Sequence, residues 1–152
     1  MIIFADTSAL GSAYLGDEAD ARWIADTVFD GPDPVVVCEL ADVEIASLLR
    51  RAHRDGRVDD PGVAERLAAY QGHTAATGPI AVVPLTHATL VRARHLVLET
   101  TVRTLDALHL AAAQILAESS EDEVTILTRD ALQATAARAL GFSLYPAPAG
   151  RA

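Results

Sequence analysis

The sequence contains no lysine and only one cysteine, and each scarcity excludes a kind of site. All twelve of the Lys+Arg residues are arginine, so enzymes whose chemistry needs an active-site lysine are disfavoured. The single cysteine, Cys38, excludes an internal disulfide and a cysteine-rich zinc site. The chemistry of this protein therefore has to come from other side chains.

Long hydrophobic runs are also missing. No apolar segment approaches the ~20 residues that cross a bilayer, and the chain reaches an acid at Asp6 without the basic segment that begins a signal peptide. We therefore expect a cytoplasmic protein with no membrane partner. With 152 residues, the chain is long enough for one domain with a single substantial core.

The balance of charge is acidic, with a formal net charge of −9 at pH 7. Broad binding to phosphate backbones needs a basic surface, so a general nucleic-acid-binding protein is disfavoured. A surplus of carboxylates can instead be offset by a bound metal ion, or it can complement a basic partner. Composition alone leaves both possibilities open.

Short apolar runs alternate with segments of helical periodicity along the chain. Strands are predicted at 1–5, 35–37, 80–85, 124–128 and 142–145, and helices at 7–15, 17–29, 39–54, from 59 onward, 86–99, 104–118 and 131–140. Strands that alternate with helices form a parallel sheet covered on both faces. We therefore predict an α/β fold, a three-layer α/β/α sandwich with a central parallel sheet of four to five strands. It would be a single domain over 1–146 with a loose tail at 147–152.

An apolar helix that begins near Thr104 carries an unusual charge. Thr104 is predicted to be its N-cap, and Leu105 and Leu108 recur at the spacing of one buried face. Asp106 lies in the first turn, where a carboxylate complements the helix dipole. Asp106 can also point into a site shared with acids from elsewhere in the chain, so two interpretations stay open.

Three further acids occupy positions of interest. Asp6 directly follows the first strand and Asp130 follows the fourth, where an aspartate is often the N-cap of a helix. Glu44 lies within an apolar stripe, which includes Val43, of the helix over 39–54. A glutamate there either takes part in a site or extends its tip to water.

Together, these four acids can converge on one point, because functional groups of open α/β sheets gather beyond the C-terminal ends of the strands. Converging carboxylates repel one another unless a cation lies among them. Mg²⁺ takes oxygen ligands, with one or two carboxylates, water and substrate phosphate. Such an ion can generate a hydroxide and stabilise a phosphodiester in transfer, so the residue types suit phosphodiester hydrolysis.

Four motifs carry a resemblance to a known family. Residues 6–10 (DTSAL), after an apolar strand, resemble the opening of PIN-domain proteins. Residues 43–44 (VE), 105–111 (LDALHLA) and 128–130 (TRD) resemble the later acidic motifs of that family in the same order, and LDALHLA is the most specific. The resemblance covers nearly the whole chain, which at this length is similar to VapC-type toxins of bacterial toxin–antitoxin pairs.

The resemblance implies an endoribonuclease that depends on Mg²⁺ or Mn²⁺. Asp6 and Asp106 would be the metal ligands, and Glu44 and Asp130 would complete a catalytic site of four acids. It further implies an RNA substrate, a homodimer and inhibition by a VapB-type antitoxin. The hypothesis is thus a toxin that hydrolyses RNA with a metal-activated water.

Other interpretations stand beside this one. A noncatalytic PIN-fold binding module, acting through an RNA or protein partner, would carry the same acids without turnover. Haloacid-dehalogenase-like phosphatases and response-regulator receivers are disfavoured because they use a lysine. His109, alone on an apolar helix, is predicted to be a hydrogen-bonded packing residue. The basic stretch at 50–57 either complements a helix C-terminus or, with Arg103, holds RNA phosphates.

Overall fold

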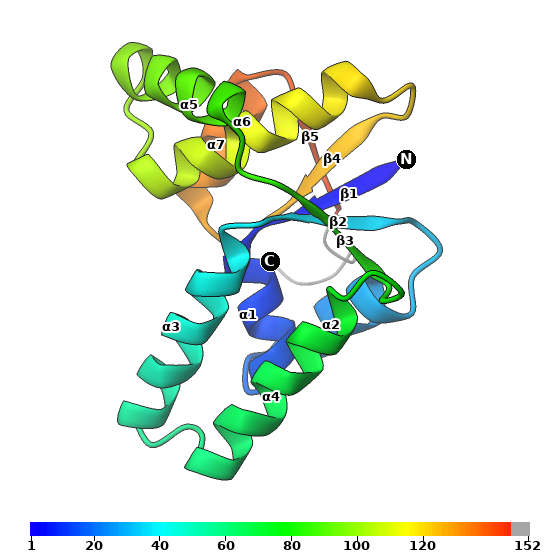
Figure 1. Ribbon diagram of the computed structural model, residues 1–152, viewed down its shortest axis with the longest axis vertical. Coiled ribbons are helices and arrows are strands. Elements are labelled where there is room, and N and C mark those ends of the chain that lie inside the picture. The colour runs from blue at the N-terminus through cyan, green and yellow to red at the C-terminus, as the bar shows by residue number, and fades with distance from the viewer. Residues whose placement is uncertain (147–152) are drawn as a thin grey trace.

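A single sheet of five parallel strands forms the centre of the computed structural model, which describes residues 1–146. The order of strands across the sheet is β3-β2-β1-β4-β5 (Figure 1). The strands are β1 (Ile2–Ala5), β2 (Val35–Cys38), β3 (Ile80–Val83), β4 (Val124–Leu127) and β5 (Ser143–Leu144). All five predicted strands are present, and the tail predicted at 147–152 lies outside the described residues.

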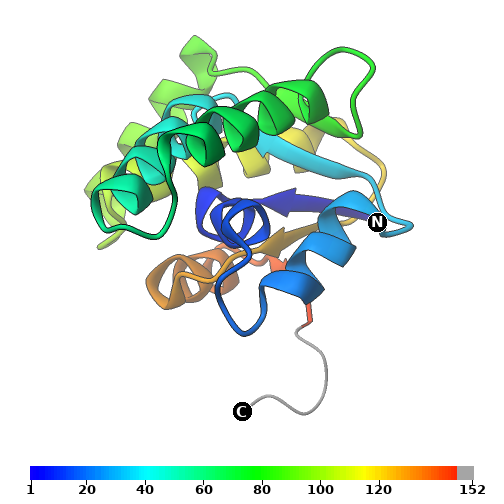
Figure 2. The same ribbon diagram turned by 90° about the horizontal axis from the view of Figure 1, so that it is seen from below.

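Helices cover the sheet on both sides. They are α1 (Thr7–Leu15), α2 (Ala21–Phe29), α3 (Ala41–Arg54), α4 (Asp60–His73), α5 (His87–Glu99), α6 (Thr104–Ser119) and α7 (Ala131–Ala139). The first four lie on one face of the sheet and the last three on the other (Figure 1 and Figure 2). The predicted three-layer α/β/α sandwich is confirmed. Within 1–146, no helix is both long enough and apolar enough to span a membrane.

Successive side chains of the central strands β1 and β2 pack into two different hydrophobic cores. Ile3 of β1 packs with α1 to α4, whereas its neighbour Phe4 packs with α6 on the opposite face. Both side chains are 1% exposed. A strand buried on both faces needs an apolar residue at every position, which explains why these strands are continuous apolar runs.

The starts of two helices differ from the prediction. α6 begins at Thr104 itself and Arg103 is its N-cap, without a side-chain cap hydrogen bond, so the prediction of Thr104 as N-cap is wrong. The Arg103 side chain instead pairs with carboxylates, as described below. α2 begins at Ala21 rather than at residue 17, because Asp17 is held by two hydrogen bonds from Arg57.

Some apolar residues predicted to face the core are exposed. Leu90 and Val97 on α5 are 52% and 40% exposed, and Val43 on α3 is 67% exposed. The helical spacing of Leu90 and Val97, and the apolar stripe that includes Val43, predict that these residues face the core, and that prediction is wrong. α5 packs chiefly on α6 and not on the sheet, so only part of its apolar surface is covered.

The register of the sheet places the C-terminal ends of β1 and β4 side by side. Ala5 at the end of β1 pairs with Leu127 at the end of β4. The next residues, Asp6 and Thr128, therefore leave the sheet at the same edge, where their side chains meet. This is the edge at which open α/β sheets hold their functional groups.

Candidate active site

Asp6, Glu44, Asp106 and Asp130 line one cavity of about 410 Å³. They come from four parts of the chain: the end of β1, the first turn of α3, the first turn of α6 and the N-cap of α7. The fold thus brings together all four acids singled out in the sequence. Further residues of the same cavity are Thr7, Ser8, Arg51, Arg103, His109 and Gln133.

Asp6 is a buried N-cap at the start of α1, with 3% of its surface exposed. Its Oδ1 accepts hydrogen bonds from the Ala9 backbone N–H at 3.0 Å and the Ser8 hydroxyl at 2.8 Å. Its Oδ2 accepts a hydrogen bond from the Thr128 hydroxyl at 2.8 Å. Burial raises the pKa of Asp6, although these hydrogen bonds act to lower it. None of these three donors is charged.

Asp130 combines a cap role with a place in the cavity. Its Oδ1 accepts hydrogen bonds from the backbone N–H groups of Leu132 at 2.8 Å and Gln133 at 3.1 Å. Its Oδ2 accepts a hydrogen bond from the Arg103 guanidinium at 2.5 Å. Burial by itself would raise the pKa of Asp130, but these hydrogen bonds outweigh it and the pKa is lowered. Asp130 is therefore both an N-cap and a residue of the cavity, two placements that the sequence offered as alternatives.

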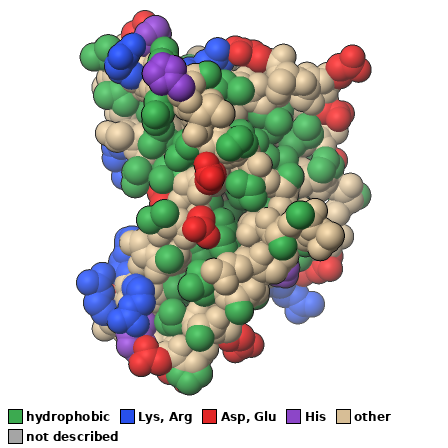
Figure 3. Space-filling model, viewed as in Figure 1, with side chains coloured by type: hydrophobic (Ala, Val, Ile, Leu, Met, Phe, Trp, Pro, Cys, Tyr) green, Lys and Arg blue, Asp and Glu red, His purple; other side chains and the backbone are tan. Residues whose placement is uncertain are grey.

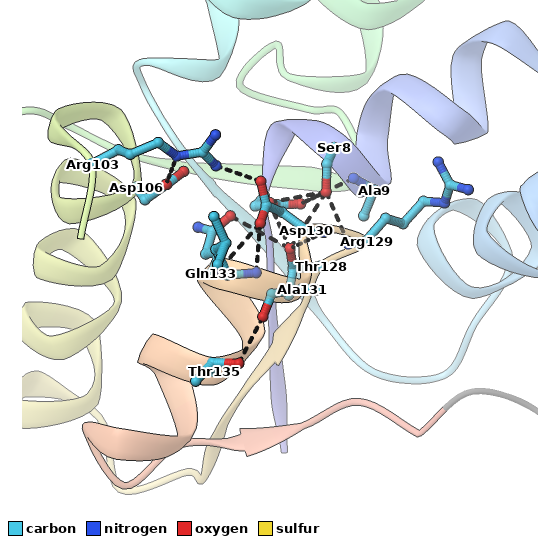
Figure 4. A network of polar contacts seen from close by, with 12 residues as sticks. Ser8, Ala9, Arg103, Asp106, Thr128, Arg129, Asp130, Ala131, Gln133 and Thr135 are labelled. Carbon is cyan, nitrogen blue, oxygen red and sulfur yellow. Dashed lines mark hydrogen bonds and ion pairs between the residues drawn. The ribbon is translucent and has the colours of Figure 1, made fainter. Parts of the chain in front are cut away.

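Arg103 joins Asp106 to Asp130. Its Nε donates a hydrogen bond to Asp106 Oδ2 at 2.7 Å, while Nη2 donates to Asp130. Figure 4 shows the guanidinium extending from the start of α6 toward the Asp130 turn. Both carboxylates raise the pKa of Arg103, and the hydrogen bond to Asp106 is the larger cause. Arg103 therefore brings a positive charge to the cavity and pairs it with two of the four acids.

Glu44 is held by two donors that also line the cavity. Its Oε2 accepts hydrogen bonds from the Thr7 hydroxyl at 2.5 Å and from His109 Nε2 at 2.6 Å. Burial alone would raise the pKa of Glu44, but the hydrogen bonds with His109 and Thr7 outweigh it and the pKa is lowered. The Glu44 carboxylate thus faces the cavity in its ionised form at neutral pH.

His109 is 3% exposed and hydrogen-bonded, so its prediction as a packing residue is confirmed. The sequence did not predict that His109 contacts Glu44 in the cavity, and it did not predict the contacts of three hydroxyl side chains with the acids. Thr7 holds Glu44, while Ser8 and Thr128 hold Asp6. The signal that could have identified these hydroxyl residues is that they lie close in the sequence to Asp6 or Asp130.

Comparison with known proteins places the chain in a family. A family model for the PIN domain matches residues 3–139. The chain belongs to the PIN domain family. Its fold is also similar to the crystal structure of Mycobacterium tuberculosis VapC20, a sarcin-ricin loop cleaving toxin, with a TM-score of 0.67. The two are 17% identical, over 95% of this chain and 99% of VapC20. A comparison with curated protein sequences gave no match.

The arginines at the end of α3 in this PIN domain do not act as one group. Arg51 lines the cavity with the four acids. In contrast, Arg50 lies 3.4 Å from Asp60, and Arg57 forms two hydrogen bonds with Asp17. Figure 3 shows basic side chains gathered at this end of the molecule, over the C-terminal end of α3. Of these three arginines, Arg51 is the one placed to meet a ligand in the cavity.

The cavity of this PIN domain offers the kind of atoms that bind a hard divalent cation. The cavity offers carboxylate oxygens, and one of them belongs to the buried Asp6, whose hydrogen-bond donors are uncharged. Within 1–146, no three His, Cys, Asp or Glu side chains lie close enough to form a ready-made metal cage. Mg²⁺ usually binds through one or two carboxylates and keeps several waters, so such a cage is not required.

Proposed function

We propose that this PIN domain is a divalent-metal-dependent endoribonuclease and the toxin of a toxin–antitoxin pair. The observation that carries the proposal is the convergence of four carboxylates, from four separate segments, on one cavity. The similarity in fold to VapC20, a sarcin-ricin loop cleaving toxin, supports RNA as the substrate. Bases in RNA loops and single strands are more accessible to a protein than those of a duplex.

Asp6 and Asp106 would hold Mg²⁺ or Mn²⁺ in this proposal. Both line the cavity, and Asp6 is the acid whose charge is least compensated by its hydrogen-bond donors. When bound, the ion would supply positive charge for the phosphodiester in transfer and would make a water molecule more acidic.

The other residues would orient the reactants and supply charge. Glu44 is fixed by Thr7 and His109 and has a lowered pKa, so it can accept a hydrogen bond from the attacking water. Asp130 fixes Arg103 beside the cavity. Arg51 and Arg103 can then donate charge-assisted hydrogen bonds to phosphate oxygens of the substrate.

A VapB-type antitoxin, a homodimer and a cytoplasmic location complete the proposal. The net charge of −9 complements a basic partner. Leu90, Val97 and Leu98 of α5 are 52%, 40% and 77% exposed. Exposed apolar surface of this kind is typical of contacts between proteins, so α5 is the helix that a second copy would cover.

The test compares the wild type with Asp106→Asn and a control, Asp26→Asn. Asp26 lies on α2 with a side chain that is 64% exposed, and it does not line the cavity of the four acids. Each protein is expressed in a bacterial host, and newly formed RNA ends are mapped across the transcriptome. The purified proteins are then incubated with the cleaved RNA in Mg²⁺, in Mn²⁺ and in EDTA.

New RNA ends at defined sites, present with the wild type and Asp26→Asn and absent with Asp106→Asn, are the expected result. Cleavage by the purified protein should require the divalent ion. Growth arrest by all three proteins without new RNA ends would contradict the proposal, and a noncatalytic binding module would then explain the effect. Circular dichroism of each variant shows whether the fold is retained.

A further inference from the structure

A second cavity, of about 210 Å³, lies directly beside the cavity of the four acids. Its walls are the segment 100–103 that leads into α6 and one side of α7. The side chains from α7 include Leu132, Ala136 and Leu140, and Val102 faces them from the other wall. We call this space the side pocket. It is lined mainly by apolar groups.

The side pocket shares three residues with the cavity of the four acids. Arg103, Asp106 and Gln133 line both spaces. Asp106 and Arg103 are hydrogen-bonded to each other, so the junction is a fixed polar boundary and not a gap between mobile side chains. A ligand that fills the cavity of the four acids therefore meets residues that also line the side pocket.

Gln133 is the polar group best placed to recognise a ligand at this junction. Its side chain is buried, with 3% of the residue exposed, and its Oε1 lies 3.4 Å from the Thr128 hydroxyl. Among residues 1–146, no hydrogen bond ties down its Nε2. Gln133 lines both cavities, so its Nε2 can donate a hydrogen bond to a ligand there.

We propose that the side pocket binds one nucleobase of the RNA, next to the phosphodiester that is cut. The inference rests on the proposed function, since it places the phosphodiester among the four acids. Ligand pockets for whole drug-sized molecules measure about 300–1,000 Å³, so the side pocket suits a single ring system and not a complete nucleotide. Single-stranded bases are recognised by apolar contacts to the ring face and hydrogen bonds to its edge.

The charge at the mouth favours a nucleic acid over a protein side chain. Arg103 presents a guanidinium where the sugar-phosphate backbone of an inserted nucleotide would lie. Leu132 is 68% exposed at the edge of the pocket, so its apolar surface is available to a flat ring. In this arrangement, Gln133 contacts the edge of the base and the α7 side chains contact its face.

The experiment fills the side pocket with Ala136→Phe and uses Arg138→Phe as the matched control. Both changes add the same ring to α7, but Arg138 is exposed and does not line the pocket. Cleavage of a single-stranded RNA library with randomised positions gives the base preference beside each cut. KM and kcat are measured on one preferred sequence, and Mn²⁺ affinity is measured by calorimetry.

The wild type and Arg138→Phe should prefer one base at a fixed position beside the cut. Ala136→Phe should lose that preference and raise KM by about tenfold, which corresponds to the loss of one base contact. Its kcat and Mn²⁺ affinity should stay within about twofold of the wild type, because the acids are untouched. If Ala136→Phe fails to fold, Leu132→Ser at the exposed edge should raise KM in the same direction.

An unchanged base preference and KM in a folded Ala136→Phe would overturn the inference and leave the pocket to a protein partner. The failure of the proposed function is distinguishable, because the wild type would then cleave no RNA. In that case, binding of an RNA oligonucleotide that carries 2-aminopurine still tests the pocket. Quenching of its fluorescence by the wild type but not by Ala136→Phe supports base binding, and equal quenching by both refutes it.

Discussion

Thr128→Val tests whether the buried Asp6 carboxylate depends on its hydroxyl donor. The Thr128 hydroxyl donates a hydrogen bond to Asp6 at 2.8 Å and accepts one from the Asp130 backbone N–H at 3.0 Å. Valine has the same shape as threonine but makes neither bond. A hydrogen bond to a charged group contributes roughly 1.5–3 kcal/mol. We expect Thr128→Val to lower the free energy of unfolding by about 2 kcal/mol.

Thr125→Val, three residues earlier on β4, is the matched control. Thr125 is 2% exposed, and its hydroxyl has no hydrogen-bond partner among residues 1–146. Replacing an unsatisfied buried hydroxyl with a methyl group removes a desolvation cost, and valine is also favoured in strands. We expect this variant to be at least as stable as the wild type, so the two substitutions should change stability in opposite directions.

Thermal unfolding at pH 7 in EDTA, followed by circular dichroism, measures both effects. For a domain of this size, a loss of about 2 kcal/mol lowers Tm by roughly 4–8 °C. Urea midpoints at 25 °C provide an independent measurement. A Thr128→Val protein that melts at the wild-type temperature would refute the reasoning. Equal destabilisation by both variants would assign the effect to the replacement of threonine by valine in this segment and not to Asp6.

Three further predictions follow from other buried groups. Glu44→Gln should abolish RNA cleavage but change Tm by less than Thr128→Val does, because an amide oxygen can still accept the hydrogen bonds from Thr7 and His109. Cleavage assays and thermal melts measure the two effects. Burial raises the pKa of Tyr70 to about 12 from its usual 10.0, so its full contribution to the free energy of unfolding should be present below pH 10 and be lost as the pH rises toward 12. Urea midpoints measured at pH 8 and pH 11 should therefore fall less for Tyr70→Phe than for the wild type. Burial raises the pKa of the Cys38 thiol to about 11, so a disulfide reagent at pH 8 should label Cys38 only after the protein is unfolded in urea. Rapid labelling of the folded protein would contradict the burial of Cys38.

Much of the fold could be predicted because the central strands β1, β2 and β4 are buried on both faces. A continuous apolar run such as that around Phe4 has few other uses in a short chain, and the alternation of runs with helices then fixes a parallel sheet. Helix packing was harder to predict. Leu90 and Val97 have helical spacing, but spacing cannot show that α5 packs on another helix and leaves part of its apolar surface exposed.

The candidate site also has a part that could be predicted from the sequence and a part that could not. The acids were identifiable because carboxylates at strand ends and in apolar helices are conspicuous in a sequence. Their partners were not, because the bonds of Thr7 with Glu44 and of Arg103 with Asp130 join residues far apart in the chain. The two roles of Asp130, cap and cavity residue, were alternatives in the sequence and are compatible in the structure.

The central position of β1 affects when the site can form during synthesis. The Thr128 hydroxyl that holds Asp6 is synthesised 122 positions after it. β1 can pair with β4, and Asp130 can join the other acids, only when residues 124–130 have been translated. The four acids therefore cannot share one cavity in a nascent chain that ends before this segment.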